Sequence, residues 1–255
     1  MRRNGENMKK ILLISNSFGV DATRYLYGIA RKAGEEVSVS CLFIGGCSLY
    51  RHYRNMLSED AAYSLYFNGI NTPYKLSLKA ALLADEWDIV TLQQVSDKSG
   101  DFSSYEPFLT ELSAYVKKYA PCAKQYIHAI WAWSDARLSL KAEAPYKTSA
   151  EMFAADHKAY AEAARRINAD GFIPCTAAME KLYAKIGDDA YRDGGHASHG
   201  VGRYMLALVW YGTLFGKSIE GIGFRDLDVE VSDEYIEIAE RCAAEAIREN
   251  TYKKA

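Results

Sequence analysis

Short apolar runs alternate along the chain with longer segments in which apolar residues recur at helical spacing. The runs that read as buried strands are residues 10–15, 37–44, 88–93, 125–130 and 171–175. Strands that alternate with helical segments are typical of a parallel sheet covered by helices on both faces. We therefore expect a doubly wound α/β domain with about five parallel strands.

Capping signals locate several of the helices. Asp21 is predicted to cap the helix after the first strand, and Ser232 the final amphipathic helix. Thr148-Ser-Ala-Glu151 has the pattern of a capping box before a long helix. Residues 200–215 are apolar almost all round and predict a buried helix. Pro174 predicts a strand end or a sheet edge.

One segment breaks the alternation. Residues 58–78 hold two β-type runs around Asn68-Gly69, a dipeptide that favours a tight hairpin turn. The chain has no internal repeat and no linker rich in proline, glycine or serine. We therefore predict one domain over residues 10–250 with a small hairpin insertion, preceded by a flexible segment at residues 1–9.

Composition narrows the class of protein. The 255 residues are 49% hydrophobic and 25% charged with a net charge of −2, so no strong field attracts nucleic acid or anionic lipid. No apolar run approaches the ~20 residues that span a bilayer. The basic start is followed by only four apolar residues, 11–14, too few for a signal peptide. Five cysteines without a C-x-x-C pair indicate reduced thiols, so a cytoplasmic protein is expected.

Small and polar residues follow the predicted strands. Ligands of open α/β sheets bind outside the carboxyl ends of the strands, which makes these turns the candidate site. The turns are Asn16-Ser17-Phe18-Gly19, Gly45-Gly46-Cys47-Ser48, Gln93-Gln94-Val95-Ser96 and Trp131-Ala132-Trp133-Ser134.

A serine hydroxyl needs a base within hydrogen-bond reach to act as a nucleophile at neutral pH. Among the five histidines, His196 stands in the segment Asp193-Gly-Gly-His-Ala-Ser198, just before the predicted buried helix. The two glycines allow the loop to fold back, so that Asp193 accepts from one ring nitrogen while the other faces Ser17. This is the logic of a catalytic triad.

These blocks resemble the SGNH (GDSL-like) hydrolase superfamily, and within it a largely uncharacterised bacterial branch. The matching blocks, in order, are Ser15-Asn-Ser-Phe18, Gly45-Gly-Cys-Ser-Leu49, Leu92-Gln-Gln94 and Asp193-Gly-Gly-His-Ala-Ser198. The resemblance covers nearly the whole chain and implies a three-layer α/β/α, flavodoxin-like fold.

The resemblance also implies site roles: Ser17 as nucleophile, His196 as base and Asp193 as the residue that orients it. The implied oxyanion donors are the N–H groups of Ser17 and Gly46, or less favourably Gly45, and a side-chain amide. The asparagine that supplies this amide in the superfamily is absent, and Gln94, with Gln93 behind it, is expected to replace it. The branch glycine two residues before the nucleophile is Ser15 here.

The implied function is a serine esterase that hydrolyses acyl esters, with the O-acetyl group of a carbohydrate as leading substrate. No cofactor or metal is required, and a small-molecule or glycan ester is the expected partner, with no nucleic acid or membrane. Trp131 is expected to contact substrate in preference to Trp133, with Gln93 as a further contact. The oligomeric state is left open.

Other interpretations of the same residues stay open. Asp193 and His196 could only fix the entrance to the buried helix, or could bind a metal together with His199. Gly45-Gly46 could serve a tight turn, and Gln94 could satisfy a buried loop. The whole domain could be a catalytically silent sugar-binding module. Cys47, without an identifiable histidine partner, is expected to be a small buried residue, and His128 a core histidine.

Overall fold

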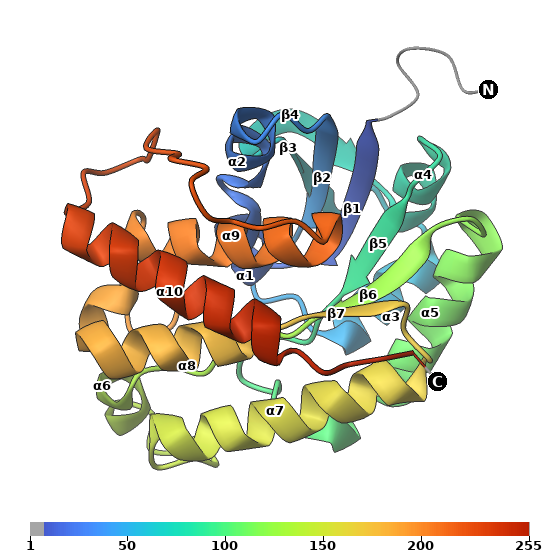
Figure 1. Ribbon diagram of the computed structural model, residues 1–255. Coiled ribbons are helices and arrows are strands. Elements are labelled where there is room, and N and C mark those ends of the chain that lie inside the picture. The colour runs from blue at the N-terminus through green and yellow to red at the C-terminus, as the bar shows by residue number, and fades with distance from the viewer. Residues whose placement is uncertain (1–7, 255) are drawn as a thin grey trace.

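A computed structural model of the protein describes residues 8–254, which fold around a sheet with strand order β4-β3-β2-β1-β5-β6-β7 (Figure 1). The strands are β1 (Lys9–Ser15), β2 (Val37–Phe43), β3 (Tyr63–Phe67), β4 (Ile70–Leu76), β5 (Ile89–Leu92), β6 (Lys124–His128) and β7 (Gly171–Ile173). β1, β2, β5, β6 and β7 are parallel, whereas β3 and β4 are antiparallel. The five predicted parallel strands are all present.

The central strands form because their apolar residues are covered on both faces. Residues Ile11 to Ile14 of β1 are at most 1% exposed. β7 lies at the sheet edge and ends just before Pro174, so both predictions from this proline hold. Of the segment predicted to be flexible, residues 1–7 lie outside the described part of the chain. Lys9 already pairs with Val37 in the sheet, so β1 begins one residue earlier than predicted.

The predicted hairpin is β3–β4, and it extends the main sheet because β3 pairs with β2. Its turn residues Asn68 and Gly69 have φ of 50° and 81°, the left-handed conformation that tight hairpins require. A Cβ at Gly69 would also lie 2.4 Å from the carbonyl oxygen of Arg24. The hairpin is therefore part of the sheet, at the edge opposite β7.

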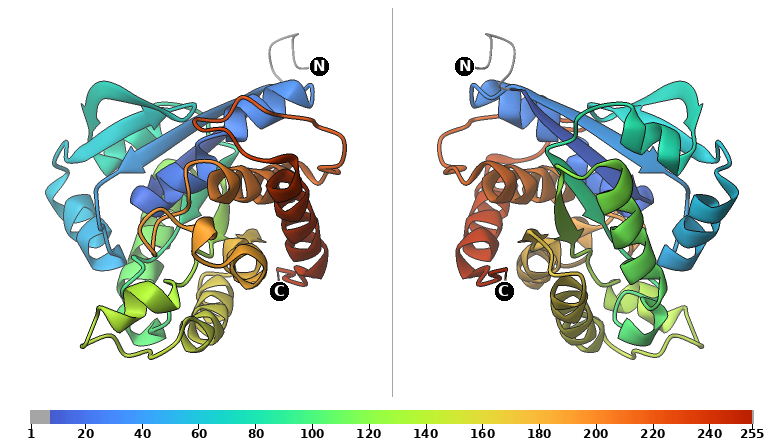
Figure 2. Two further views of the ribbon diagram at one scale, coloured as in Figure 1. Left: turned by 90° about the vertical axis from the view of Figure 1, so that its left-hand side faces the viewer. Right: turned by 90° about the vertical axis from the view of Figure 1, so that its right-hand side faces the viewer.

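Ten helices and two 3-10 turns surround the sheet in the described residues. They are α1 (Ser17–Thr23), α2 (Leu26–Lys32), α3 (Leu49–Ser58), α4 (Leu78–Leu83), η1 (Phe102–Ser104), α5 (Phe108–Tyr119), α6 (Asp135–Ser139), α7 (Ser149–Arg166), α8 (Cys175–Ile186), η2 (Gly187–Ala190), α9 (Val201–Phe215) and α10 (Asp233–Glu249). α9 packs against α1, α2, α8 and α10 on one face, and α5 packs against α3 and α4 on the other (Figure 2). The three-layer α/β/α architecture is thereby confirmed.

The predicted helix caps and the predicted buried helix are confirmed, with one exception. Thr148 and Ser232 cap α7 and α10 as predicted, and α9 is buried along most of its length. Asp21 does not cap the first helix, which begins earlier, with Asn16 as its cap. Asp21 instead lies within α1, 1% exposed and paired with arginines from later in the chain, which local sequence could not indicate. No helix between residues 8 and 254 is long and apolar enough to cross a membrane.

Gly171 provides a test of the β6–β7 packing. It lies opposite Tyr126, and a Cβ at this position would come within 2.1 Å of the tyrosine ring. We expect Gly171→Ala to lower the free energy of unfolding by about 1–3 kcal/mol, measured by urea denaturation. The control is Gly45→Ala, whose Cβ would meet nothing closer than 3.8 Å and should change stability by less than about 0.5 kcal/mol. Equal effects of the two variants would contradict the packing argument.

Candidate active site

Ser17 is the first residue of α1, directly after β1 ends at Ser15. The side chain of Asn16 caps this helix, with its Oδ1 accepting a hydrogen bond of 3.0 Å from the N–H of Phe18. The first N–H groups of a helix have no acceptor within it. The Ser17 N–H also has none elsewhere in residues 8–254. The N–H of Ser17 is thus unpaired at the carboxyl edge of the sheet.

The loop before α9 folds back around the carboxylate of Asp193. Its Oδ1 accepts hydrogen bonds from the N–H groups of Gly195, at 3.0 Å, and His196, at 2.7 Å. Gly194 has φ of 73°, a conformation that favours glycine. The other oxygen, Oδ2, lies 2.7 Å from Nδ1 of His196. The carboxylate therefore fixes both the backbone and the ring of the histidine.

The structure brings Ser17 and His196 together, with 2.8 Å between Oγ and Nε2. Partial burial of Asp193 acts to raise its pKa, but hydrogen bonds from His196 and Gly195 together outweigh it and lower the pKa to about 2. Because the ionised carboxylate can only accept, Nδ1 of the neutral ring carries the proton and donates to Asp193. Nε2 is then the acceptor for the Ser17 hydroxyl.

Arg137 in α6 packs against this loop and leaves little room for a side chain at Gly194 or Gly195. A Cβ at Gly194 would lie 2.8 Å from the Arg137 Cβ, and one at Gly195 would lie 3.1 Å from its guanidinium carbon. Arg137 Nη1 donates to the carbonyl oxygen of Asp193 at 3.1 Å, and the guanidinium stacks 4.8 Å from the ring of Trp133. Arg137 was not predicted from the sequence. The glycine pair at 194 and 195 was the only sign that another side chain packs closely against this loop.

A cavity of about 160 Å³ opens beside the Ser17–His196 pair. Its lining residues are Asn16, Ser17, Phe18, Gly46, Val95, Ser96, Trp133, Arg137, Gly195 and His196. Gly46 has φ of 59°, and its N–H has no hydrogen-bond acceptor within the described chain. Two unpaired backbone donors, from Ser17 and Gly46, therefore belong to one small cavity.

Gln94 does not reach this cavity. Its Oε1 accepts from the N–H groups of Leu49 and Val95, both at 2.9 Å, and its Nε2 donates to the carbonyl and hydroxyl oxygens of Ser104. The amide thus holds the loop after β5, which is the alternative role that the sequence left open for Gln94. It does not act as an oxyanion donor because the longer glutamine side chain turns away from the strand end. Val95 and Ser96 are the residues of this block that line the cavity.

Gln93 is also buried, 2% exposed, and lies behind the site instead of in it. Its Oε1 accepts from the Ser15 hydroxyl and from Nδ1 of His128, each at 2.8 Å. Its Nε2 donates to Oδ1 of Asn16 at 2.8 Å. Gln93 therefore supports the helix cap next to Ser17, and the serine that replaces the branch glycine at position 15 takes part in this network.

Of the two tryptophans after β6, Trp133 and not Trp131 borders the cavity. Trp131 is fully buried, where it packs 4.6 Å from Phe18 and donates to the carbonyl oxygen of Gly195 at 2.9 Å. Trp133 lines the cavity. The prediction that Trp131 contacts substrate is wrong, because this indole is enclosed in the core, whereas Trp133, although 9% exposed, borders the cavity.

Cys47 does have a histidine partner, contrary to the sequence analysis. His52 lies one turn into α3, with Nδ1 3.5 Å from the Cys47 Sγ and 2.9 Å from the Tyr63 hydroxyl. Burial raises the pKa of Cys47 to about 12 and lowers that of His52 to about 3. The thiol therefore stays protonated and unreactive, and its interpretation as a small buried residue stands.

The residues proposed for a metal site do not form one. Within residues 8–254 no group of three or more histidine, cysteine, aspartate or glutamate side chains is arranged to hold a metal ion. Asp193 and His196 bind each other, while the carbonyl of His199 accepts from the Tyr25 hydroxyl. The helical spacing of the three residues is interrupted because α9 begins only at Val201.

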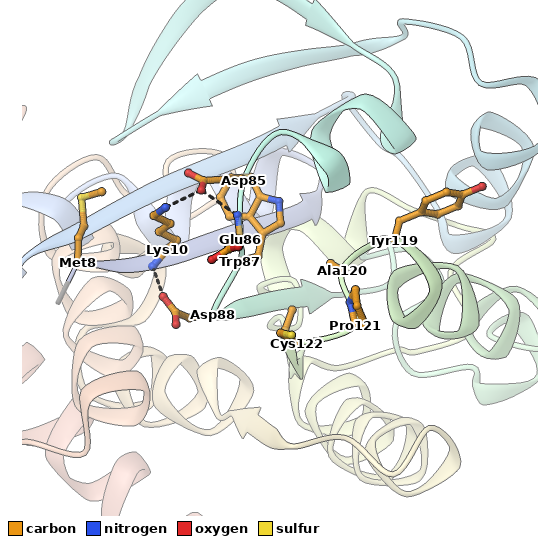
Figure 3. A pocket seen from close by; sticks show the side chains of 11 residues that line it. Met8, Lys10, Asp85, Glu86, Trp87, Asp88, Tyr119, Ala120, Pro121 and Cys122 are labelled. Atoms are coloured by element: carbon orange, nitrogen blue, oxygen red, sulfur yellow. Dashed lines mark hydrogen bonds and ion pairs between the residues drawn. The ribbon is translucent and has the colours of Figure 1, made fainter. Parts of the chain in front are cut away.

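A larger cavity of about 680 Å³ lies at the opposite, amino ends of β1, β5 and β6 (Figure 3). Lys10 Nζ lies 2.5 Å from Asp85, and the Lys10 N–H donates to Asp88 at 2.8 Å. The polar groups of this cavity are thus largely paired with one another. We place the candidate site at the smaller cavity, where loops from several strand ends converge on unpaired donors.

Solved structures of other proteins share the fold of this domain. A protein described as a GDSL-like lipase from Parabacteroides merdae is 18% identical with a TM-score of 0.54, covering 82% of this chain and 96% of that one. The Clostridium thermocellum family 3 carbohydrate esterase is 12% identical with a TM-score of 0.53, covering 82% and 96%. The domain has the SGNH-like hydrolase fold that the sequence blocks predicted.

A family model gives a closer relationship than the shared fold does. The chain belongs to the family described as "Domain of unknown function (DUF4886)", whose model matches residues 10–246. A solved DUF4886 family protein from Bacteroides uniformis is 26% identical with a TM-score of 0.86, covering 97% of this chain and 98% of that one. No curated protein matches the chain.

The buried ring of His128, which lies behind the site, should make the free energy of unfolding fall in acid. Burial lowers its pKa to about 3, whereas an unfolded histidine titrates near 6.5. The neutral ring therefore stabilises the fold fully above pH 6.5, and this stability is lost as the pH falls toward 3. Between pH 7 and 4, the wild type should lose on the order of 3 kcal/mol more unfolding free energy than His128→Asn, which keeps a donor toward Gln93. Equal losses in urea titrations would contradict this.

Proposed function

We propose that the protein is a serine esterase that hydrolyses acyl esters. The observation that carries the proposal is the continuous chain from Ser17 Oγ through the His196 ring to the Asp193 carboxylate, at 2.8 and 2.7 Å. A hydroxyl, an imidazole and an ionised carboxylate in this order are the parts that acyl transfer requires. They border a cavity at the edge of the sheet where ligands bind in such folds.

In the proposed reaction, Ser17 Oγ forms a bond to the ester carbonyl carbon as its proton passes to Nε2 of His196. Asp193 stabilises the imidazolium through Nδ1–H. The tetrahedral intermediate collapses, the bond to the alcohol oxygen breaks, and Nε2 returns the proton to the leaving alcohol. Water, deprotonated by Nε2 of His196, then attacks the acyl carbon. The bond to Ser17 Oγ breaks, and Nε2 returns the proton to Oγ, which releases the acid and restores the serine hydroxyl.

The negative charge on the carbonyl oxygen requires donors that are already in place. The N–H groups of Ser17 and Gly46 are unpaired and belong to the same cavity, which supports their assignment as oxyanion donors. Because Gln94 is engaged elsewhere, the polar cavity residue of its block, Ser96, is our third donor. Its hydroxyl would replace the side-chain amide of the superfamily.

The size of the cavity supports a short acyl group. About 160 Å³ between Phe18, Val95 and Trp133 suits an acetyl group better than a long chain. The carbohydrate esterase among the related structures supports a sugar as the alcohol part. We therefore propose an O-acetylated carbohydrate as the substrate class, with no metal or organic cofactor taking part.

Removal of the nucleophile tests the mechanism. Ser17→Ala should lower kcat for p-nitrophenyl acetate by on the order of 10⁴-fold or more, because no other hydroxyl between residues 8 and 254 is hydrogen-bonded to His196. Asp193→Asn should cost on the order of 10²–10⁴-fold, because the amide cannot hold the ring in the donor tautomer. A fluorophosphonate should label Ser17 in the wild type alone.

Circular dichroism spectra of the variants should match the wild type, which separates chemistry from folding. Activity that survives Ser17→Ala and is lost to a chelator would contradict the proposal in favour of a metal-dependent hydrolase. A wild type that is inactive on every acyl ester but binds acetylated sugars would identify a silent binding module.

Trp133 should limit the length of the acyl group. Trp133→Ala removes one wall of the cavity, and we expect the ratio of kcat/KM for the butyrate over the acetate p-nitrophenyl ester to rise by about 10-fold. The matched control is Trp131→Phe, a buried change outside the cavity, which should lower stability and leave the ratio unchanged. An unchanged ratio in Trp133→Ala would contradict the assignment of the acyl site.

A further inference from the structure

A buried cluster of charges joins the helix that begins at Ser17 to the loop that carries His196. Its centre is Asp21, which is 1% exposed and lies one turn after Ser17 in α1. Arg192 Nη1 donates to both carboxylate oxygens of Asp21 at 2.9 Å. Arg203, in α9, donates to Oδ1 through Nε at 2.9 Å. A carboxylate so deeply buried is tolerated only with such partners.

Arg192 holds the histidine loop at two further points. Its backbone N–H donates to the carbonyl oxygen of His196 at 3.0 Å. The same Nη1 that binds Asp21 donates to the carbonyl oxygen of Ala197 at 2.7 Å. Arg192 also directly precedes Asp193 in the chain. One side chain thus contacts both the residue after the histidine and the helix that begins at the serine.

The outer part of the cluster is similar in chemistry but reaches this loop only at its end, where the Tyr25 hydroxyl joins the Asp228 N–H to the carbonyl oxygen of His199 in the described chain. Asp228 accepts from Arg24 Nε at 3.0 Å and from Arg203 Nη1 at 2.9 Å. Each of the two aspartates is therefore bound by two arginines, and Arg203 is shared between them. Among the three arginine side chains of the cluster, only that of Arg192 donates to the backbone next to His196 in the described part of the chain, at the carbonyl oxygen of Ala197.

We propose that Asp21 and Arg192 are a positioning pair that sets the separation between Ser17 Oγ and His196 Nε2. This inference rests on the proposed esterase function. Neither side chain lines the cavity, so neither is expected to touch substrate. Because the serine and the histidine come from distant segments, their 2.8 Å contact depends on a rigid connection between α1 and the loop. The pair supplies that connection one turn away from the reacting atoms.

The test compares two matched variants, each of which removes one of the two arginines from an aspartate. Arg192→Met leaves Asp21 bound to Arg203, and Arg24→Met leaves Asp228 bound to Arg203. Arg192→Met should lower kcat for p-nitrophenyl acetate by on the order of 10²-fold, with KM within about 2-fold, since small misplacements of catalytic groups have effects of this size. Arg24→Met should leave kcat unchanged.

Two further measurements separate positioning from a general loss of structure. The rate of Ser17 labelling by a fluorophosphonate should fall in parallel with kcat in Arg192→Met, at a temperature well below the Tm of either variant. Arg192→Lys keeps the charge, but its side chain is one bond shorter and does not reach all three acceptors that Nη1 holds, so its kcat should fall between those of Arg192→Met and the wild type. It also decides the question should Arg192→Met fail to fold.

The outcomes distinguish this inference from the proposed function. A wild type that neither hydrolyses esters nor reacts with the phosphonate would overturn the function itself. An active wild type with full kcat and labelling rate in a folded Arg192→Met or Arg192→Lys would overturn the positioning role alone. Equal losses of kcat in Arg192→Met and Arg24→Met would also overturn it, because they would show a dependence on stability only.

Discussion

The contact between Ser17 and His196 depends on how α1 packs against the segment that leads into α9. Ser17 begins α1, His196 lies just before α9, and the two helices pack together on one face of the sheet. The Arg203 side chain crosses from α9 to Asp21 in α1. A hydrogen bond of 2.8 Å between segments so distant in the chain persists only where both are held from behind. The packing of these helices is thus the physical basis of the site.

A second layer of polar groups supports the strand ends. Gln93 connects Ser15, Asn16 and His128 behind the nucleophile, and Gln94 holds the loop that carries Ser96. Buried amides are stable only when their donors and acceptors are satisfied, so each also fixes its surroundings. The block after β5 therefore shapes the cavity through its buried side chains, while Val95 and Ser96 line it.

Predictions from the sequence failed where one residue type can serve in two places. Gln94 has an amide that suits an oxyanion donor and equally suits a buried loop, and its direction is set by Leu49 and Ser104. The choice between Trp131 and Trp133 depends on how the chain turns after β6. Asp21 looks like a helix cap until distant arginines are folded against it. For Gln94 and Asp21, partners that decide the role lie far away in the sequence: Leu49 for Gln94, and Arg192 and Arg203 for Asp21.

The sequence by itself determined the order of strands and helices, the hairpin at Asn68-Gly69, and the local loop in which Asp193 holds His196. These features follow from hydrophobic periodicity and turn chemistry, which act between near neighbours in the chain. Only the tertiary structure decided which side chains reach the cavity, which become buried supports, that Arg137 lies against the loop, and that Arg192 binds Asp21. Those outcomes depend on packing and charge pairing between segments that the sequence separates, and local patterns carry no information about them.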